Sequence, residues 1–161
     1  MDILRILAAL TAFAICTFEG YRRGRELKDR AVFLAEIALL IERFSIGIRY
    51  CGRTPDELLE HENGSFATLV KEFKNDLGDS RAAWEKACDA LPKKREETAL
   101  LRDLGRSLGS FDKESALRLL ERCGAEIAAL KSTADAEYSK RGRAFFQVGT
   151  LCGIGAAVLI I

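Results

Sequence analysis

The chain has 161 residues, with 25 basic and 24 acidic side chains and a formal net charge of +1. This length suits one domain of ordinary size, and the balanced charge gives no overall field that would favour nucleic acid. With 2 prolines, 5 cysteines and 48% hydrophobic residues, the composition excludes disordered, collagen-like and disulfide-rich proteins. The scarcity of proline favours helix through nearly the whole chain.

The charges are distributed unevenly along the chain. Residues 1–20 carry three and residues 144–161 carry none, so 46 of the 49 charged side chains lie in residues 21–143. An 18-residue helix is about 27 Å long, close to the ~30 Å hydrocarbon core of a bilayer. We therefore predict transmembrane helices at residues 1–20 and 144–161, with a cytoplasmic α-helical domain between them. A cleaved signal peptide is the alternative for the first run, but Asp2 and Arg5 cancel and leave it without a basic leader.

Basic side chains flank both apolar runs. Each flank has a net charge of +3, within residues 22–30 and from residues 140–143. Since Lys and Arg resist translocation, we expect both flanks and the central domain in the cytoplasm and both termini on the extracytoplasmic side. The simpler interpretation is that these rims set topology alone, and the alternative is that they also bind anionic lipid headgroups. The basic rim residues are Arg22, Arg23, Arg25, Lys28, Arg30, Lys140, Arg141 and Arg143.

Small residues recur every four positions in both apolar runs. Three successive members of such a stripe share one helix face, and membrane helices associate where small residues let their backbones approach. We predict that the two stripes face each other, or a partner's span, and set the angle of an antiparallel stalk. Chance recurrence of Gly and Ala is the alternative. The stripes are Ala8, Ala12, Cys16, Gly20 and Gly24, and Gly149, Gly153 and Ala157.

Apolar residues at helical spacing predict an all-α fold, a membrane-anchored six-helix bundle with a long antiparallel stalk. The first helix continues from the membrane to near Gly52, and Thr54-Pro55-Asp56-Glu57 starts a short second one with a capping box. Asp79 or Ser80 caps the helix over residues 80–91. The other helices are expected over residues 65–77, over 96–108, and from Ser110 or Asp112 into the C-terminal run.

Catalytic patterns are missing from the sequence. The single histidine, His61, stands beside Glu60 and Glu62 in the short helix, where a solvated side chain is more common than a ligand. The five cysteines show no metal-binding or paired spacing and are interpreted as reduced thiols. Trp84 is interpreted as a core residue, with a partner hot spot as the alternative. We expect no enzyme activity, cofactor or metal, and a module that binds proteins.

Several short motifs occur in a specific order. The N-terminal run exits through Gly24–Leu27 (Gly-Arg-Glu-Leu), and Ile48-x-Tyr50 is followed by Thr54-Pro55. Ala82-Ala83-Trp84 and then Leu101-x-x-Leu-Gly-x-Ser-Leu-Gly-x-x-Asp come later in the chain. Together they resemble, over essentially the whole chain, the stage III sporulation protein AB family of endospore-forming Firmicutes. The motif residues are Tyr50, Thr54, Pro55, Trp84, Leu104, Gly105, Leu108, Gly109 and Asp112.

The chain also departs from the family pattern. One residue is added in Cys51-Gly52-Arg53, Gly47 stands where an acidic residue is usual, and Asp56 stands where leucine is usual. These differences affect contacts of that turn and leave the expected fold unchanged.

The resemblance implies a role in the secretion-like channel complex that links mother cell and forespore. It implies a cytoplasmic region similar to the helical domain of type II secretion and type IV pilus platform proteins. The expected partners are the membrane and other channel subunits, including a secretion-type ATPase; self-association is left open and no nucleic acid is expected. The expected location is the mother-cell membrane around the forespore. A small pore-forming protein or other membrane scaffold is the alternative function, and a membrane-tethered enzyme is disfavoured.

Overall fold

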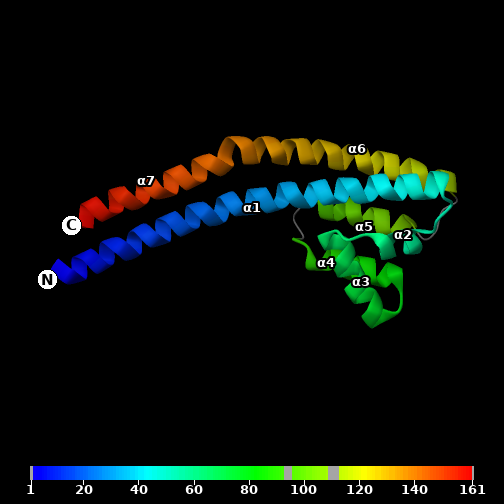
Figure 1. Cartoon of the computed structure of the whole chain (residues 1–161), viewed down its shortest axis with the longest axis horizontal. Helices are drawn as coiled ribbons and strands as arrows, with labels where there is room; N and C mark the ends of the chain where they lie inside the picture. The colour runs from blue at the N-terminus through cyan, green and yellow to red at the C-terminus, as the bar shows by residue number, and fades with distance from the viewer. Residues whose placement is uncertain (1, 93–95, 109–112, 161) are drawn as a thin grey trace. The chain divides into compact units, whose positions relative to one another are not determined.

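The computed structural model describes residues 2–92, 96–108 and 113–160, apart from the side chains of some helical residues near both termini and at 107–108. The described part is helical with short connections and contains no strand. Figure 1 shows the helices in chain order. They are α1 (Asp2–Tyr50), α2 (Pro55–His61), α3 (Ser65–Leu77), α4 (Ser80–Ala90), α5 (Glu96–Leu108), α6 (Lys113–Glu137), the π-helix η1 (Tyr138–Gly142) and α7 (Arg143–Ile160). The all-α prediction is confirmed.

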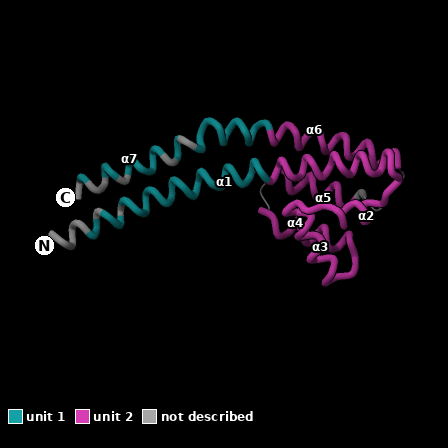
Figure 2. Tube along the Cα trace, viewed as in Figure 1, with its two compact units in different colours: residues 1–32, 132–161 teal, residues 33–131 magenta. Residues whose placement is uncertain are grey.

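The chain divides into two compact units, coloured separately in Figure 2. Unit 1 comprises residues 1–32 and 132–161, and unit 2 comprises residues 33–131. Both α1 and α6 contribute residues to each unit. The boundaries between units therefore fall inside helices.

Local sequence signals explain where the helices of unit 2 begin and end. The Thr54 hydroxyl accepts a hydrogen bond from the Glu57 backbone N–H, and the Thr54 N–H donates to the Glu57 carboxylate, so the predicted capping box is present. Helix α3 ends at Leu77 and is capped by Gly78, whose φ of 71° lies in the left-handed region that glycine adopts readily. Of the two predicted caps for α4, Asp79 is the one used, accepting from the N–H groups of Arg81 and Ala82.

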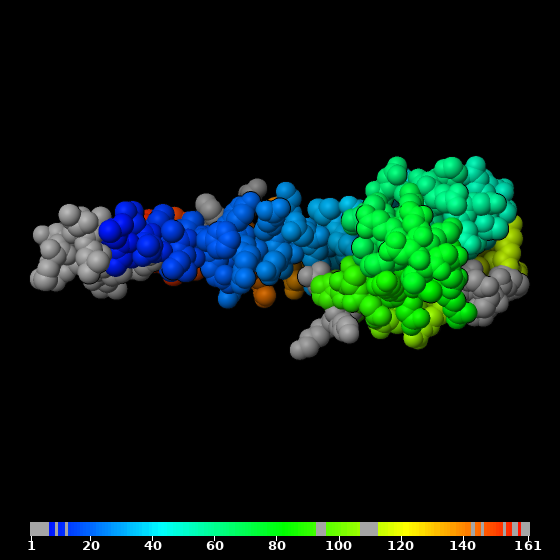
Figure 3. All heavy atoms as spheres, turned by 90° about the horizontal axis from the view of Figure 1, so that it is seen from below, coloured from blue at the N-terminus to red at the C-terminus, as the bar shows by residue number. Residues whose placement is uncertain are grey.

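Apolar faces of all six helices build the core of unit 2. Helix α1 contributes side chains at the predicted helical spacing, and α3 packs on α4 and α4 on α5. Helices α3 and α4, green in Figure 3, lie on the face of unit 2 seen there. The largest buried apolar side chains of this core are Leu34, Ile37, Phe44, Phe66, Leu101, Leu104, Leu120 and Ile127. Burial of these stripes is the main favourable term in folding the unit.

The far ends of α1 and α6 within unit 2 are tied by polar contacts. The Arg49 guanidinium forms an ion pair with the Glu121 carboxylate. The Lys113 ammonium donates to the backbone carbonyl of Arg49 at 2.9 Å. Both contacts are exposed, so each contributes little to stability.

In unit 1, the N-terminal part of α1 runs antiparallel to η1 and α7. Gly20 lies against Phe145 and Gly149, and Gly24 lies against Gly142. Residue numbers therefore increase along one helix where they decrease along the other. The antiparallel pairing was predicted, whereas the π-helix between α6 and α7 was not. A single π-turn inserts an extra residue into the helical repeat and frequently occurs at functional positions.

Membrane crossing was predicted for both apolar runs. Among the described residues, no helix is both long enough and apolar enough to cross a membrane. The two spans are thus not confirmed, and membrane anchorage stays a prediction.

Candidate functional site

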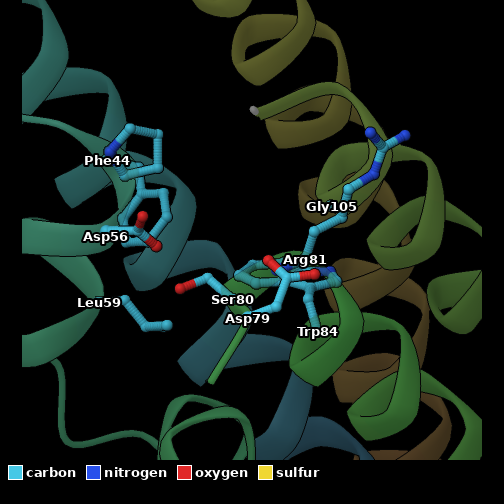
Figure 4. Close-up of a pocket in the computed structure, with 9 residues that line it drawn as sticks. Phe44, Asp56, Leu59, Asp79, Ser80, Arg81, Trp84 and Gly105 are labelled. Carbon is cyan, nitrogen blue, oxygen red and sulfur yellow. The ribbon is translucent and has the colours of Figure 1, made fainter. Parts of the chain in front are cut away.

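Motif residues from three distant segments meet at one pocket in unit 2, which we call the Trp84 pocket. Pro55 comes from the start of α2, Trp84 from α4 and Gly105 from α5. The pocket has a volume of about 290 Å³ and is open to solvent on one side. Figure 4 shows its residues, which are Phe44, Pro55, Asp56, Leu59, Asp79, Ser80, Arg81, Trp84 and Gly105.

Trp84 forms the floor of the pocket and is held rigidly. Its indole Nε1–H donates to the Leu101 carbonyl at 2.7 Å, in the middle of α5. Its ring lies edge-on to Phe66 with the centroids 5.0 Å apart, and the Phe44 ring is 6.5 Å away. The residue is only 5% exposed. The interpretation of Trp84 as a core residue therefore holds for most of its surface, while its remaining edge faces the pocket.

Gly105 lets α5 approach the indole. A Cβ atom at this position would lie 2.1 Å from Cδ1 and 2.4 Å from Nε1 of Trp84, closer than any real Cβ contact. Only glycine fits while the Nε1–H bond to the Leu101 carbonyl is kept. The contact between Gly105 and Trp84 thus explains why two motifs that are separate in the sequence occur together.

The rim of the pocket is polar and carries charges of both signs. Asp79 caps α4 through two backbone N–H groups at 3.2 Å. The Asp56 carboxylate lies 3.9 Å from the Lys74 ammonium. Arg81 is exposed, and its guanidinium forms no ion pair with any residue that the structure describes. An aromatic floor under such a rim suits a protein contact, because Trp and Arg are enriched where partners bind most strongly.

The remaining motif residues lie elsewhere or outside the described set. Leu104 is buried in the core at 1% exposure, and Tyr50 is 77% exposed at the end of α1 and does not line the pocket. The Leu108 side chain, Gly109 and Asp112 lie outside the described residues.

The structure also explains a departure from the family pattern at Gly47. A Cβ there would lie 2.4 Å from Cδ2 of Leu58, so α2 packs directly on this glycine. The Gly47 carbonyl accepts from the backbone N–H groups of Cys51 and Arg53, and Gly52 adopts a φ of 61°. The added residue is thus accommodated by a glycine-dependent end to α1. Asp56, the other departure, adds a carboxylate to the pocket rim.

The predicted packing stripes are only partly described. Gly20 and Gly149 face each other, since a Cβ on either would lie 3.2 Å from the Cα of the other, and Cys16 adjoins Gly149 through its carbonyl. Ala8 is exposed. The environments of Ala12, Gly153 and Ala157 lie outside the described side chains. The structure places part of the two stripes in contact, and their role in assembly stays a prediction.

The basic rim residues belong to unit 1. Arg22 and Arg23 contact Glu19 at 3.0 and 3.1 Å, and Arg25 lies 3.8 Å from Asp29. Lys28, Lys140 and Arg141 are exposed, and Arg30 is half-buried. The Arg143 side chain is outside those described. Ion pairs this exposed contribute little to stability. Because most of the rim side chains are exposed, they are accessible to solvent or lipid.

Chemistry beyond binding finds little support in the described residues. His61 is exposed, and no group of three or more His, Cys, Asp or Glu side chains in the described residues could hold a metal ion. Burial raises the pKa of the Cys88 thiol to about 11, and burial also raises that of Cys123, so both stay protonated at neutral pH. Protonated, buried thiols are poor nucleophiles.

The comparisons with known proteins agree with the motifs. The sequence profile of the stage III sporulation protein AB family matches residues 5–161. The chain belongs to this family. A curated relative, the stage III sporulation protein AB of Bacillus subtilis (strain 168), is 21% identical over 172 aligned residues, covering 99% of the chain and 100% of the relative. No solved structure matches significantly. Membership in the family implies a role in sporulation.

Sequence reasoning named three of the nine pocket residues through the motifs. It missed Phe44, which it had placed in the apolar stripe of the first helix, and Leu59, which no motif marks, and it considered Asp79 only as a cap. No local pattern links Arg81 to the pocket. Its place follows from its position two residues after the cap, on the first turn of α4.

Proposed function

We propose that the chain is a non-catalytic membrane platform subunit of the secretion-like complex that links mother cell and forespore during sporulation. The observation that carries the proposal is the meeting of three motif segments at the Trp84 pocket. A pocket of about 290 Å³ is at the lower limit for small-molecule sites but can take one or two side chains of a partner. Contact with another protein is therefore the use that fits it best.

The rim suggests how a partner is selected. Arg81 offers a cation that forms no ion pair with the described residues, and Asp56 and Asp79 offer carboxylates on the same rim. A partner loop with an apolar tip and flanking charges could place the tip on the indole of Trp84 and pair with the rim. The expected partner is the secretion-type ATPase of the same complex, since a platform without catalytic groups needs a source of energy.

Membrane anchorage is the second part of the proposal. Residues 1–20 and 144–161 cross the membrane, both termini are extracytoplasmic, and the central domain is cytoplasmic. Supporting this are the uncharged run of 18 residues, the basic flanks, and large apolar side chains left exposed on unit 1. Those side chains include Ile15, Phe18, Leu151 and Val158, each at least 67% exposed.

Affinity purification of the full chain from sporulating cells tests the platform role. The variant Arg81→Glu reverses a rim charge without removing any side-chain contact that holds the fold, and Arg118→Glu makes the same change on the exposed face of α6, away from the pocket. We expect Arg81→Glu to lose the ATPase or another channel subunit, and Arg118→Glu to retain it. Equal recovery with both variants at equal protein levels would refute the pocket as the partner contact.

Two further experiments separate the proposal from its alternatives. Cys51 is exposed, so an impermeant maleimide should miss it in intact cells and label it after lysis, whereas Cys88 and Cys123 are too buried to report. Labelling of Cys51 without lysis would overturn the topology.

His61→Ala should leave sporulation unchanged, and a strict requirement for His61 at normal protein levels would reopen an enzymatic role.

A further inference from the structure

Unit 1 contains a second depression, which we call the stalk groove. It has a volume of about 720 Å³ and lies where α1 meets η1 and the start of α7. Both sides of the antiparallel helix pair contribute residues to it. They are Gly20, Tyr21, Gly24, Arg25, Lys28, Asp29, Tyr138, Gly142 and Gln147.

Glycines bring the two backbones together along the floor of the stalk groove. A Cβ at Gly20 would lie 2.6 Å from the Phe145 carbonyl oxygen, and one at Gly24 would lie 3.1 Å from the Gly142 carbonyl oxygen. Gly142 in turn leaves room for the Tyr138 ring, which a Cβ there would approach to 2.8 Å. Tyr138 and Gly142 both belong to the π-helix. The glycines thus form the floor of the groove, and the larger side chains form its walls.

The walls of the groove carry polar groups with few partners. Arg25 lies 3.8 Å from Asp29 in a pair whose side chains are both about two-thirds exposed. The Lys28 ammonium, the Gln147 amide and the hydroxyls of Tyr21 and Tyr138 form no hydrogen bond or ion pair with the described residues. Two cations against one carboxylate leave the groove with a net positive charge and several free donors.

Apolar surface adjoins these donors within the same unit. Phe18 and Ile15 precede the groove residues on α1, and Val148 and Leu151 follow Gln147 on α7, all more than half exposed. Tyr and basic residues beside exposed apolar side chains are typical of the headgroup level of a bilayer, and basic pockets between such helices bind anionic lipid headgroups.

We propose that the stalk groove binds the headgroup of an anionic phospholipid. The phosphate accepts from Arg25, Lys28 and the two tyrosine hydroxyls, and the acyl chains lie along the exposed apolar side chains. A soluble phosphate has the same chemistry but gains nothing from that apolar surface, so the lipid is the source we favour. The inference rests on the membrane anchorage proposed above.

A thermal shift of the purified full chain in detergent tests the proposal. Phosphatidylglycerol should raise the melting temperature and phosphatidylcholine should not. In the double variant Arg25→Gln/Lys28→Gln we expect the affinity for phosphatidylglycerol to fall roughly tenfold or more. The matched control, Arg22→Gln/Arg23→Gln, removes the same charge from the same helix outside the groove and should keep the shift.

Each other outcome has a definite meaning. Equal losses in the two double variants would reduce the effect to surface charge and overturn the site. A shift produced by glycerol phosphate alone would identify a free-phosphate site and also overturn the lipid assignment. Flotation with phosphatidylcholine vesicles tests the anchorage separately: a chain that floats but shows no preference for phosphatidylglycerol contradicts only this inference.

Discussion

Gly105 of α5 lies directly against the indole of Trp84 in α4, where a Cβ atom on the glycine would be 2.1 Å from Cδ1 of the ring. The same indole donates its N–H to the Leu101 carbonyl one turn earlier in α5. A single residue without a side chain thus allows a buried hydrogen bond between helices, and that bond orients the floor of the proposed partner pocket.

Replacement of Gly105 by alanine should destabilise unit 2. Alanine gains about 1 kcal/mol of helix propensity, but its Cβ would displace the indole, and overpacking of this kind costs about 1–3 kcal/mol in addition to the strained Nε1–H bond. We expect a lower melting temperature in the full chain, followed by circular dichroism in detergent. Gly124→Ala is the control, since its Cβ would lie 3.4 Å from Cγ2 of Ile41, an ordinary contact, and it should be neutral or stabilising. Similar effects of the two variants would contradict this account.

The helices of unit 2 could be predicted because local chemistry marks their ends. The capping box at Thr54, the left-handed Gly78 and the Asp79 cap define boundaries within a few residues of chain, independently of tertiary packing. The predicted limits of 65–77 and 96–108 match α3 and α5.

Other features depend on packing that no local pattern reports. Leu77 continues the apolar stripe of α3 but is 45% exposed, because it is the last residue of the helix and lies beyond the core. The π-helix at residues 138–142 has no distinct periodicity in the sequence. The Trp84 pocket combines residues of α1, α2, α4 and α5, and the stalk groove combines residues of α1 with others more than 100 positions later in the chain. The motifs identified the importance of Trp84 and Gly105, and only the fold shows that they touch.

The capping box offers a second test of the pocket's architecture. Thr54→Ala removes the hydroxyl that accepts from the Glu57 N–H, and loss of such a cap costs about 1 kcal/mol. Because α2 carries Pro55, Asp56 and Leu59 to the pocket, we also expect weaker partner recovery. Thr68→Ala, on the exposed face of α3, is the control. An unchanged unfolding free energy for Thr54→Ala would show that packing alone holds α2.

The Cys88 thiol predicts a pH dependence of stability. Its pKa is raised by burial from 9.0 to about 11, so the thiol ionises more readily in the unfolded chain. Its contribution to stability is complete below about pH 9 and is lost as the pH rises toward 11. The melting temperature should therefore fall less steeply over this range in Cys88→Ala than in the unmodified chain. Cys51→Ala, which changes an exposed cysteine, should keep the original slope. Identical slopes for all three proteins would rule out Cys88 as a contributor.

The antiparallel pair of unit 1 gives the most direct test of close backbone packing. A side chain at Gly149 would meet the Cys16 carbonyl oxygen at 2.9 Å, and one at Gly20 would meet that of Phe145 at 2.6 Å. Since both obstacles are backbone atoms, which cannot move aside as a side chain can, Gly149→Leu should force the helices apart. Gly155→Leu provides a matched control on the same helix, because a Cβ there has none of the described atoms within 4 Å. We expect Gly149→Leu to lower the melting temperature in detergent, by an overpacking cost of about 1–3 kcal/mol or more, and to impair sporulation in its own host. The control should do neither at equal protein levels in the membrane fraction, and equal defects in both variants would show that bulk in α7, rather than contact with α1, is what matters.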